Sequence, residues 1–314
     1  MALAPITVKQ RKTVEDELGY DDVQVQKKIE QIKDWMKKQP HLPSLPDDYA
    51  VKFIRQYLIG TKFSTEVTKY KIDTFFSMRH QLPEIFCTRD PLQKDVIDSI
   101  DKVRYLCLPD LTPEGYRVHI LNYNDEDKEK RFTGKDLKGF YKRMMATASA
   151  RVMQDEFCCG EVLISDSRGF YLNHLTELPW LFIQKFTSLA QEGLPIRIKG
   201  VYMINNVSYV EQALNILKPC FKEKVRKRIH VLSGDHTSLY KYIPQKMLPK
   251  DYGGDGPSIV EQTAAWQKTI ESMRDFIIED DKRRTDEAKR PKDNTNVHGQ
   301  LFGINGTFNK LNID

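Results

Sequence analysis

Short apolar runs that alternate with helical segments are the feature that most constrains the fold of this chain. Between the runs lie segments with helical character, over about 133–152, 175–190 and 210–217. Strands separated by helices pair as parallel neighbours, because the helix carries the chain back across the sheet. The sequence therefore predicts an α/β unit with a mainly parallel sheet, whose strands are the apolar runs 118–121, 162–164, 196–204 and 229–232.

The residues before this unit follow a helical period instead. Apolar positions recur every three or four residues from Val25 to Met36, a second run ends at Gly60, and a third begins after Ser64, a good helix N-cap. We find no strand-like alternation before about residue 115. The sequence thus predicts a helical N-terminal lobe over 1–90, before an α/β lobe over 91–256.

The remaining residues, 257–314, form a third segment. Residues 258–278 again follow a helical period, whereas 279–300 are polar and of mixed charge. Such a composition buries little apolar surface. We therefore expect a C-terminal helix followed by a mobile tail.

Composition places the chain among globular proteins of a reducing compartment. Of its 314 residues 40% are hydrophobic and 10% aromatic, and the net charge is only +5. The five cysteines form no CxxC pair, and no apolar stretch is long enough to span a bilayer. The N-terminus lacks the apolar core of a signal peptide. We expect a cytoplasmic protein that binds no nucleic acid, since the basic segment lacks interleaved aromatics.

No catalytic or metal-binding motif is recognisable. The chain has no glycine-rich phosphate loop, no GxSxG elbow and no metal-like spacing among its seven histidines. Ser165-Asp166-Ser167 follows a strand, but it lacks a partner motif and is typical of a turn. We therefore expect a binding protein with no catalytic residue, no metal and no cofactor. An unrecognised α/β enzyme is the alternative.

The strand that begins at Ile196 separates apolar and charged residues. Side chains alternate along a strand, so Ile196 and Ile198 point to one face, and Arg197 and Lys199 to the other. A bulge at the following glycine would return Val201 to the apolar face. An edge strand protected by its cations is the alternative interpretation.

Two further segments have a functional and a simpler explanation. Five of the seven residues in 222–228 are basic, and Lys224 and Arg228 share a helix face. With Arg197 and Lys199 they would form a phosphate-binding cluster, or they are an ordinary solvated surface. The apolar helix 210–217 is either a lid over a ligand or part of the core.

The order of these segments resembles the CRAL-TRIO family, in particular its tocopherol- and retinaldehyde-binding members. The resemblance rests on L-P-x-x-x-x-G-x-x-x-I-N at 194–205 and L-P-x-x-Y-G-G at 248–254, and extends over most of 20–255. Residues 306–311 resemble the tail of insect members. The arginine-rich run of the family's N-terminal lobe is absent, with Gln56, Ile59 and Thr61 at its basic positions.

The resemblance implies an α/β lobe with an internal lipid cavity and a gate helix over about 207–217. It implies a monomeric carrier that binds one hydrophobic molecule, such as a tocopherol, retinoid or carotenoid, and transfers it at membranes with the help of phosphoinositide. A phosphoinositide-sensing adaptor or a phospholipid-transfer protein is the alternative. The implied phosphoinositide site is Arg197, Lys199, Lys224 and Arg228. The implied lipid-binding residues are Phe140, Thr147, Ile164, Phe186, Leu194, Ile196, Ile198, Val201, Val210 and Leu214, with Thr147 as a polar contact.

Overall fold

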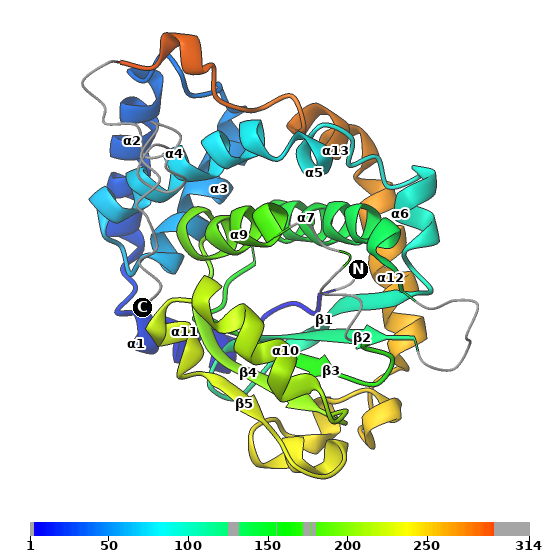
Figure 1. The fold of residues 1–314 in the computed structure, drawn as a ribbon. Helices are drawn as coiled ribbons and strands as arrows, with labels where there is room; N and C mark the ends of the chain where they lie inside the picture. Colours follow the sequence, from blue (N-terminus) through cyan, green and yellow to red (C-terminus); the bar gives the residue numbers. More distant parts are fainter. Residues whose placement is uncertain (1–2, 125–131, 155, 172–176, 178–179, 292–314) are drawn as a thin grey trace, which may run out of the picture.

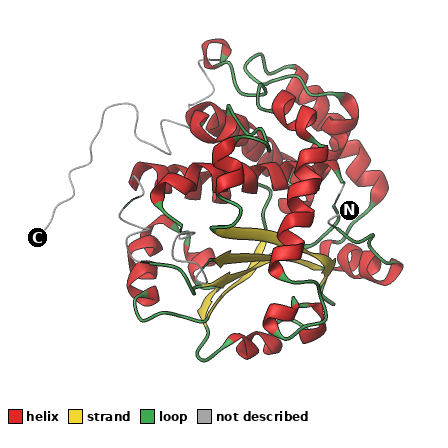
Figure 2. Cartoon of the chain, turned by 90° about the vertical axis from the view of Figure 1, so that its right-hand side faces the viewer, coloured by secondary structure: helices red, strands yellow, loops and turns green. Residues whose placement is uncertain are grey.

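The computed structural model describes residues 3–124, 132–154, 156–171, 177 and 180–291. Helices from the first third of the chain pack beside a five-stranded sheet that is covered on both faces (Figures 1 and 2). The strands lie in the order β1-β2-β3-β4-β5, with β1 and β2 antiparallel and the other neighbours parallel. This confirms the predicted α/β class with a helical N-terminal region and a mainly parallel sheet.

The strands are β1 (Val103–Leu111), β2 (Tyr116–Tyr123), β3 (Gly160–Asp166), β4 (Ile198–Ile204) and β5 (Ile229–Val231). The α-helices are α1 (Val8–Leu18), α2 (Asp22–Lys37), α3 (Asp47–Gly60), α4 (Thr65–Gln81), α5 (Pro83–Phe86), α6 (Lys94–Asp98), α7 (Leu137–Met153), α9 (Trp180–Ser188), α10 (Val210–Leu217), α11 (Glu223–Arg226), α12 (Ile259–Ser272) and α13 (Arg274–Asp280). Short turns are η2 (Gly134–Asp136), η3 (Leu189–Gly193, π-helical), η4 (Lys218–Cys220), η5 (His236–Lys241), η6 (Gln245–Met247), η7 (Lys250–Tyr252) and η8 (Glu287–Lys289).

Local signals set several of these boundaries as expected. The Ser64 side chain accepts a hydrogen bond from the Val67 amide at the start of α4. Thr133 and Asp136 form a capping box before α7, at the start of the segment predicted as helical. The helix α10 has the predicted bounds. The segment predicted as a helix over 175–190 lies partly outside the described residues, and its described part is α9 with the start of η3.

The strand β1 contradicts the expectation that no strand precedes residue 115. It pairs with β2 from Val103 to Leu111. Leu106, Cys107 and Leu108 are consecutive and all buried, so the strand shows no apolar–polar alternation. Pro109 weakens the strand signal further, and it is tolerated because β1 lies at the edge of the sheet.

The two faces of the sheet have different partners. The face that carries His119 and Leu163 lies toward α7, as the contact of His119 with Arg151 shows. The opposite face carries Ile120 and Ile164, which pack in one core with residues of η5–η7 and α12. Figure 1 shows α7 and α9 above the sheet and the segment 236–252 below it.

Residues 279–291 correct the expectation of a mobile tail over 279–300. Asp280 and Asp281 form ion pairs with Arg79 and Arg89, and both arginines are 1% exposed. Farther along, Arg290 pairs with Asp73 of α4 at 2.9 Å. Composition misses this attachment because the partners lie about two hundred residues earlier. Residues 292–300 lie outside the described residues.

We predict that Asp280→Asn lowers the free energy of unfolding by about 3–5 kcal/mol, because Arg79 and Arg89 then lose a buried counter-charge. Burial raises the pKa of the Asp280 carboxyl, but the two arginines outweigh this and lower it to about 2. The stabilisation is thus present above about pH 4 and lost as the pH falls toward 2. Urea denaturation of wild type and variant across this pH range measures both effects.

The matched control is Glu279→Gln. Glu279 pairs with Lys282 at the surface, where water screens the pair, so its loss should leave the stability nearly unchanged. Equal losses for the two variants would show that the buried ion pairs do not hold the C-terminal segment.

Candidate functional site

An inner cavity of about 270 Å³ lies between the N-terminal helices, α7 and the sheet. Its walls are mostly apolar and aromatic, as in sites for small hydrophobic ligands. The end of α3 lies close to the segment that precedes β4. A Cβ on Gly60 would be only 2.3 Å from the Pro195 carbonyl oxygen. The apolar lining comprises Tyr49, Phe53, Tyr57, Ile59, Phe75, Phe86, Met144, Met145, Ala148, Val152, Cys158, Val162, Leu163, Phe186, Ala190, Leu194, Pro195, Ile196 and Ile198.

Four of the ten lipid-binding residues implied by the resemblance line this cavity. They are Phe186, Leu194, Ile196 and Ile198. The sequence also indicated a bulge near Gly200, and the pairing of β3 with β4 shifts there, with Glu161 opposite Ile198 and the next residue opposite Gly200. Because Lys199 is the extra residue, Ile198 and Val201 both lie on the α7 face, although Val201 is not part of the cavity wall.

Three other implied wall residues lie elsewhere. Phe140 packs with Val103 and Leu137 in a separate cluster. Thr147 is buried, but its hydroxyl donates to the Arg143 carbonyl of its own helix at 3.0 Å. Ile164 belongs to the core on the opposite face, whereas its neighbour Leu163 lines the cavity. A shift of one residue moves a strand side chain to the other face, which explains the difference at Ile164.

Charged and polar residues form one end of the cavity, which we call the polar end. It comprises Tyr105, His119, Arg151, Glu156, Glu161 and Arg197. Arg151 donates to Glu161 at 2.8 Å and also pairs with Glu156. His119 contacts Glu161 at 3.2 Å through Nε2, and the Tyr105 hydroxyl at 2.8 Å through Nδ1. The network therefore links β1, β2 and β3 to α7.

The sequence analysis did not find the polar end. Its members come from four segments that are far apart in the chain, and none of them follows a motif. A weak signal exists in β3, where Glu161 directly precedes the apolar run 162–164. A charge at a position that a strand buries requires a partner, and here the partners are Arg151 and His119.

His119 is held in its charged form by this network. Burial disfavours the imidazolium, but the Cys107 sulfur and the Glu161 carboxylate outweigh burial and raise the pKa of His119 to about 9. Burial raises the pKa of the Glu161 carboxyl, but Arg151 and then His119 outweigh it and lower this pKa below its usual range. The polar end thus presents fixed charges at neutral pH.

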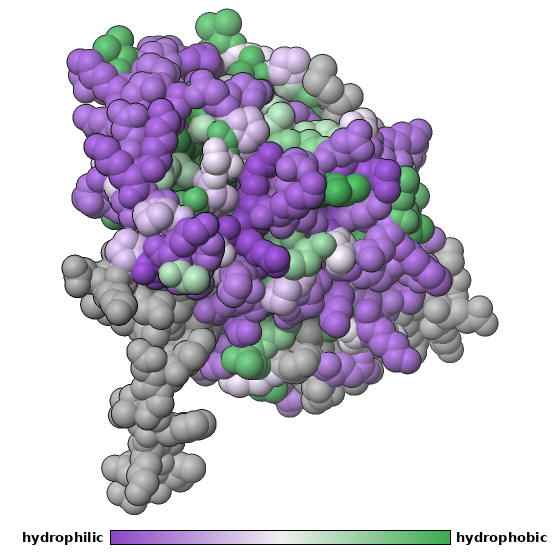
Figure 3. Space-filling model, turned by 90° about the horizontal axis from the view of Figure 1, so that it is seen from above, coloured by the Kyte–Doolittle hydropathy of each residue, from purple (hydrophilic) through white to green (hydrophobic). Residues whose placement is uncertain are grey.

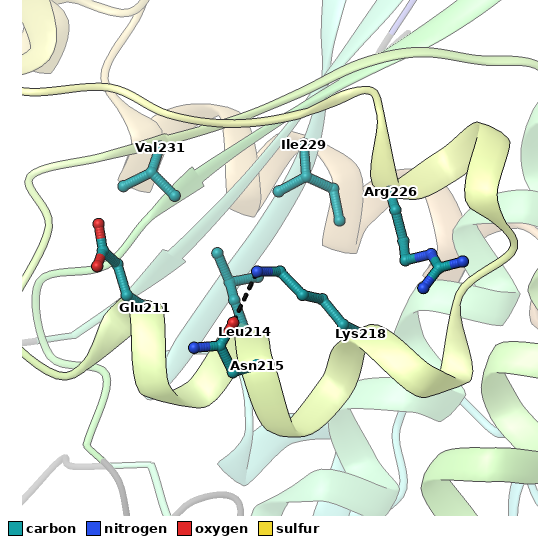
Figure 4. A pocket seen from close by; sticks show the side chains of 7 residues that line it. All are labelled: Glu211, Leu214, Asn215, Lys218, Arg226, Ile229 and Val231. Atoms are coloured by element: carbon teal, nitrogen blue, oxygen red, sulfur yellow. Dashed lines mark hydrogen bonds between the residues drawn. The ribbon is translucent and has the colours of Figure 1, made fainter.

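A second pocket, the α10 groove, has a volume of about 340 Å³ and lies between α10 and β5. Figure 4 shows Leu214 of α10 pointing toward Ile229 and Val231 of the strand. The lipid-binding residues implied on α10 therefore do not reach the inner cavity, since Leu214 lines this groove and Val210 is buried at the helix start. Only Val210 and Ala213 of α10 are buried.

Three of the four implied phosphoinositide-binding cations are brought together near the start of β4. Lys199 pairs with Glu17 of α1 at 2.8 Å, and Arg197 approaches the same carboxylate at 3.8 Å. Arg228 donates to the Ile198 carbonyl. Lys224 is exposed on α11, four residues before Arg228. The helix α1 was not anticipated, and its Glu17 occupies the centre of the expected anion site.

Two positions where the sequence departs from the family's arginine-rich run line the inner cavity. Gln56 donates to the Glu156 backbone carbonyl, and Ile59 is part of the apolar wall. The third, Thr61, bonds the Thr68 hydroxyl at 2.6 Å. These residues therefore serve the cavity and the helical lobe rather than the surface.

The surface seen from above is largely hydrophilic, with hydrophobic residues in separate small patches (Figure 3). In the part of the chain that the structure describes, no helix is long and apolar enough to cross a membrane. Among the same residues, no cluster of three His, Cys, Asp or Glu side chains has the arrangement of a metal site.

Comparisons with known proteins match both parts of the chain. The profile of the CRAL/TRIO domain matches residues 102–254, and that of the Pinta-like UBA domain matches residues 21–96. Alpha-tocopherol transfer protein-like of Mus musculus is 26% identical over 255 residues, which cover 80% of this chain and 71% of the relative. Clavesin-2 of Rattus norvegicus is 23% identical over 269 residues, covering 85% and 79%.

The crystal structure of Sfh5 has a similar fold. It aligns with a TM-score of 0.51 and 12% identity over 83% of this chain and 99% of that chain. At this identity the likeness concerns the fold alone.

We predict that Glu161→Gln lowers the pKa of His119 well below about 9, because burial then acts against a weaker counter-charge. In the wild type, the stabilisation from charged His119 is full below about pH 6.5 and is lost as the pH rises through about 9. The variant should lack this loss of stability between pH 7 and 9. An NMR titration of the histidine rings measures the pKa, with the His119→Gln spectrum for assignment.

An unchanged His119 titration in Glu161→Gln would contradict the proposed network. The signals of His41, His80, His230 and His236 serve as internal controls, because none of these described rings contacts Glu161.

Proposed function

We propose that this chain, which belongs to the CRAL/TRIO domain family, is a non-enzymatic carrier that binds one hydrophobic molecule in its inner cavity and exchanges it at membranes. The observation that carries the proposal is the cavity itself, an apolar space of about 270 Å³ lined mostly by aromatic and aliphatic side chains. Candidate ligands are a tocopherol, a retinoid or a carotenoid, and the similarity to alpha-tocopherol transfer protein-like supports the first.

The driving force for binding is burial of the ligand's apolar surface. Each Å² removed from water contributes roughly 25 cal/mol, so a ligand that buries several hundred Å² gains several kcal/mol. The cavity is already formed by rigid elements such as α3 and α7, which limits the cost of ordering it. Release therefore needs an environment as apolar as the cavity, and a bilayer provides one.

The helix α10 is the candidate gate. It is eight residues long, only two of its side chains are buried, and the α10 groove separates it from β5. Ile216 on its outer side is 49% exposed. Few buried contacts mean a small free-energy cost of local opening. A helix with apolar residues on both sides suits a lid that closes over a ligand and then contacts lipid.

The basic segment 222–228 supports contact with an anionic membrane. Lys222, Lys224, Arg226 and Lys227 are exposed next to Arg228 and the start of β4. Because Glu17 neutralises Lys199, an anionic head group would have to compete with α1 for this cation. The five cysteines are unpaired, which supports the cytoplasm as the place of exchange.

The same exposed cations favour one second candidate function. A phosphoinositide-sensing adaptor would bind phosphoinositide vesicles through this segment and would yield no exchangeable apolar ligand. Native purification and mass spectrometry of the organic extract separate the two functions.

We predict that this extract contains one hydrophobic compound at about one molecule per chain, and that Ala148→Phe reduces its yield to less than about a tenth. Ala148 faces the cavity from the middle of α7, so a phenyl ring there fills ligand space. Ala264→Phe on the exposed side of α12 is the matched control and should retain the ligand. A wild-type extract without a stoichiometric apolar compound would contradict the carrier function.

We also predict opposite effects of two charge changes on ligand transfer to anionic vesicles. Lys224→Glu should slow transfer about tenfold, because each cation near an anionic surface contributes about 1 kcal/mol. Glu17→Gln should speed transfer several-fold by freeing Lys199. A fluorescent-ligand transfer assay measures both rates.

Lys37→Glu on α2 is the control for a change of net charge, since Lys37 lies at the surface with Asp34 as its partner. If Lys224→Glu and Lys37→Glu slow transfer equally, the proposal that the basic segment 222–228 contacts the membrane is wrong. The rate of transfer would then depend only on the net charge of the protein. Solution affinity for the ligand should be the same in wild type and Lys224→Glu.

A further inference from the structure

Arg197 occupies an unusual position at the polar end of the inner cavity. It lines the cavity, and its side chain is only 12% exposed. Its Nη1 atom is buried and has no hydrogen-bond partner among the described residues. Its Nη2 atom lies 3.8 Å from a carboxylate oxygen of Glu17, which is beyond hydrogen-bond distance.

A buried guanidinium N–H without an acceptor is costly, because it has lost its bonds to water. The neighbouring arginines are satisfied: Arg151 of the polar end bonds two carboxylates, and Arg117, behind the cavity wall, bonds Glu156 and the Leu108 carbonyl. Among the cavity-lining residues that the structure describes, Arg197 alone has a buried side-chain nitrogen or oxygen without a partner. The missing partner must be an acceptor, since a guanidinium only donates.

The charges around Arg197 indicate which kind of acceptor. Four cations, Arg117, Arg151, Arg197 and Lys199, face three carboxylates, those of Glu17, Glu156 and Glu161. Glu17 is shared, and its closer contact is with Lys199 at 2.8 Å. The group thus has an excess of positive charge even with neutral His119. An anionic acceptor fits this excess better than a neutral one.

We infer that the inner cavity selects a lipid acid, an apolar molecule that ends in a carboxylate, and that Arg197 binds this carboxylate at the polar end. The inference rests on the proposed carrier function but narrows its candidate ligands, because tocopherols and carotenoids carry no carboxylate and, among the named candidates, only a retinoid acid does. Guanidinium and carboxylate form paired, nearly parallel hydrogen bonds, which fix orientation as well as add affinity.

This orientation places the apolar part of the ligand against Phe53, Phe75 and Phe186 on the other walls of the cavity. Nη1 is buried, and no hydrogen bond holds it, so a rotation of the Arg197 side chain toward the ligand would break no bond of that atom. A neutral alcohol of equal length would fill the same walls. It would leave most of the excess positive charge without a partner.

The test uses two probes that differ only at the polar end, myristic acid and myristyl alcohol. Delipidated wild-type protein is titrated with each by calorimetry at neutral pH. We expect myristate to bind about tenfold more tightly or better, as a charge-assisted hydrogen bond requires. In Arg197→Gln the ratio of affinities should fall to about one through weaker myristate binding, with the affinity for the alcohol unchanged.

Lys37→Gln is the matched control, because Lys37 lies at the surface of α2 and belongs neither to the cavity wall nor to the group of charges around Arg197. It should keep the preference for myristate. Carboxyl-labelled myristate gives an independent readout by NMR. When bound to the wild type, its carboxyl should titrate at a lower pH than the carboxyl of free myristate, because a nearby cation stabilises the carboxylate. This measurement does not depend on any variant.

The outcomes separate the two proposals. If neither probe binds and no apolar compound is extracted from native protein, the carrier function fails. If both probes bind with equal affinity and the labelled carboxyl titrates as in solution, the carrier function stands and the carboxylate preference is overturned. A preference for myristate that survives in Arg197→Gln would also overturn the assignment to Arg197.

Discussion

The ionic contacts of Arg89 hold α7 and the C-terminal segment together at one wall of the cavity. This side chain bonds Asp280 and Asp281 after α12, and it also donates to the Met145 carbonyl and the Ser149 hydroxyl of α7. It lines the cavity as well. A hollow in a protein interior loses dispersion contacts and is filled unless its walls are fixed. Buried, directional bonds from Arg89 fix α7 relative to the C-terminal segment, and so they keep the hollow open.

The cavity combines two environments that usually exclude one another. Aromatic side chains from α3 and α4 form most of the wall, whereas Arg151, Glu156 and Glu161 form the polar end. Replacing such buried charges by apolar residues is often neutral or stabilising. Their retention next to an apolar space is therefore better explained by recognition of a polar group than by stability. The apolar walls provide affinity, and the polar end provides orientation.

The sequence predicted what depends on local periodicity and failed where distant segments meet. The bounds of α10, the capping box of α7 and the parallel strands follow from nearby residues. The wall position at Ile164 was off by one residue, because both neighbours in a doubly buried strand are apolar and only the register distinguishes their faces. The pairs of Asp280 with Arg79 and of Glu17 with Lys199 have no local pattern at all.

Glu17 connects the cations near the start of β4 with the polar end of the cavity. Its carboxylate lies between Lys199, which is outside the cavity wall, and Arg197, which is part of it. Two cations that compete for one carboxylate leave both incompletely neutralised. An anion at the membrane surface that attracts Lys199 would move α1 and remove Glu17 from Arg197. The same event would strengthen the hold of Arg197 on an acidic ligand, so release would have to come from opening of the apolar walls rather than from loss of charge.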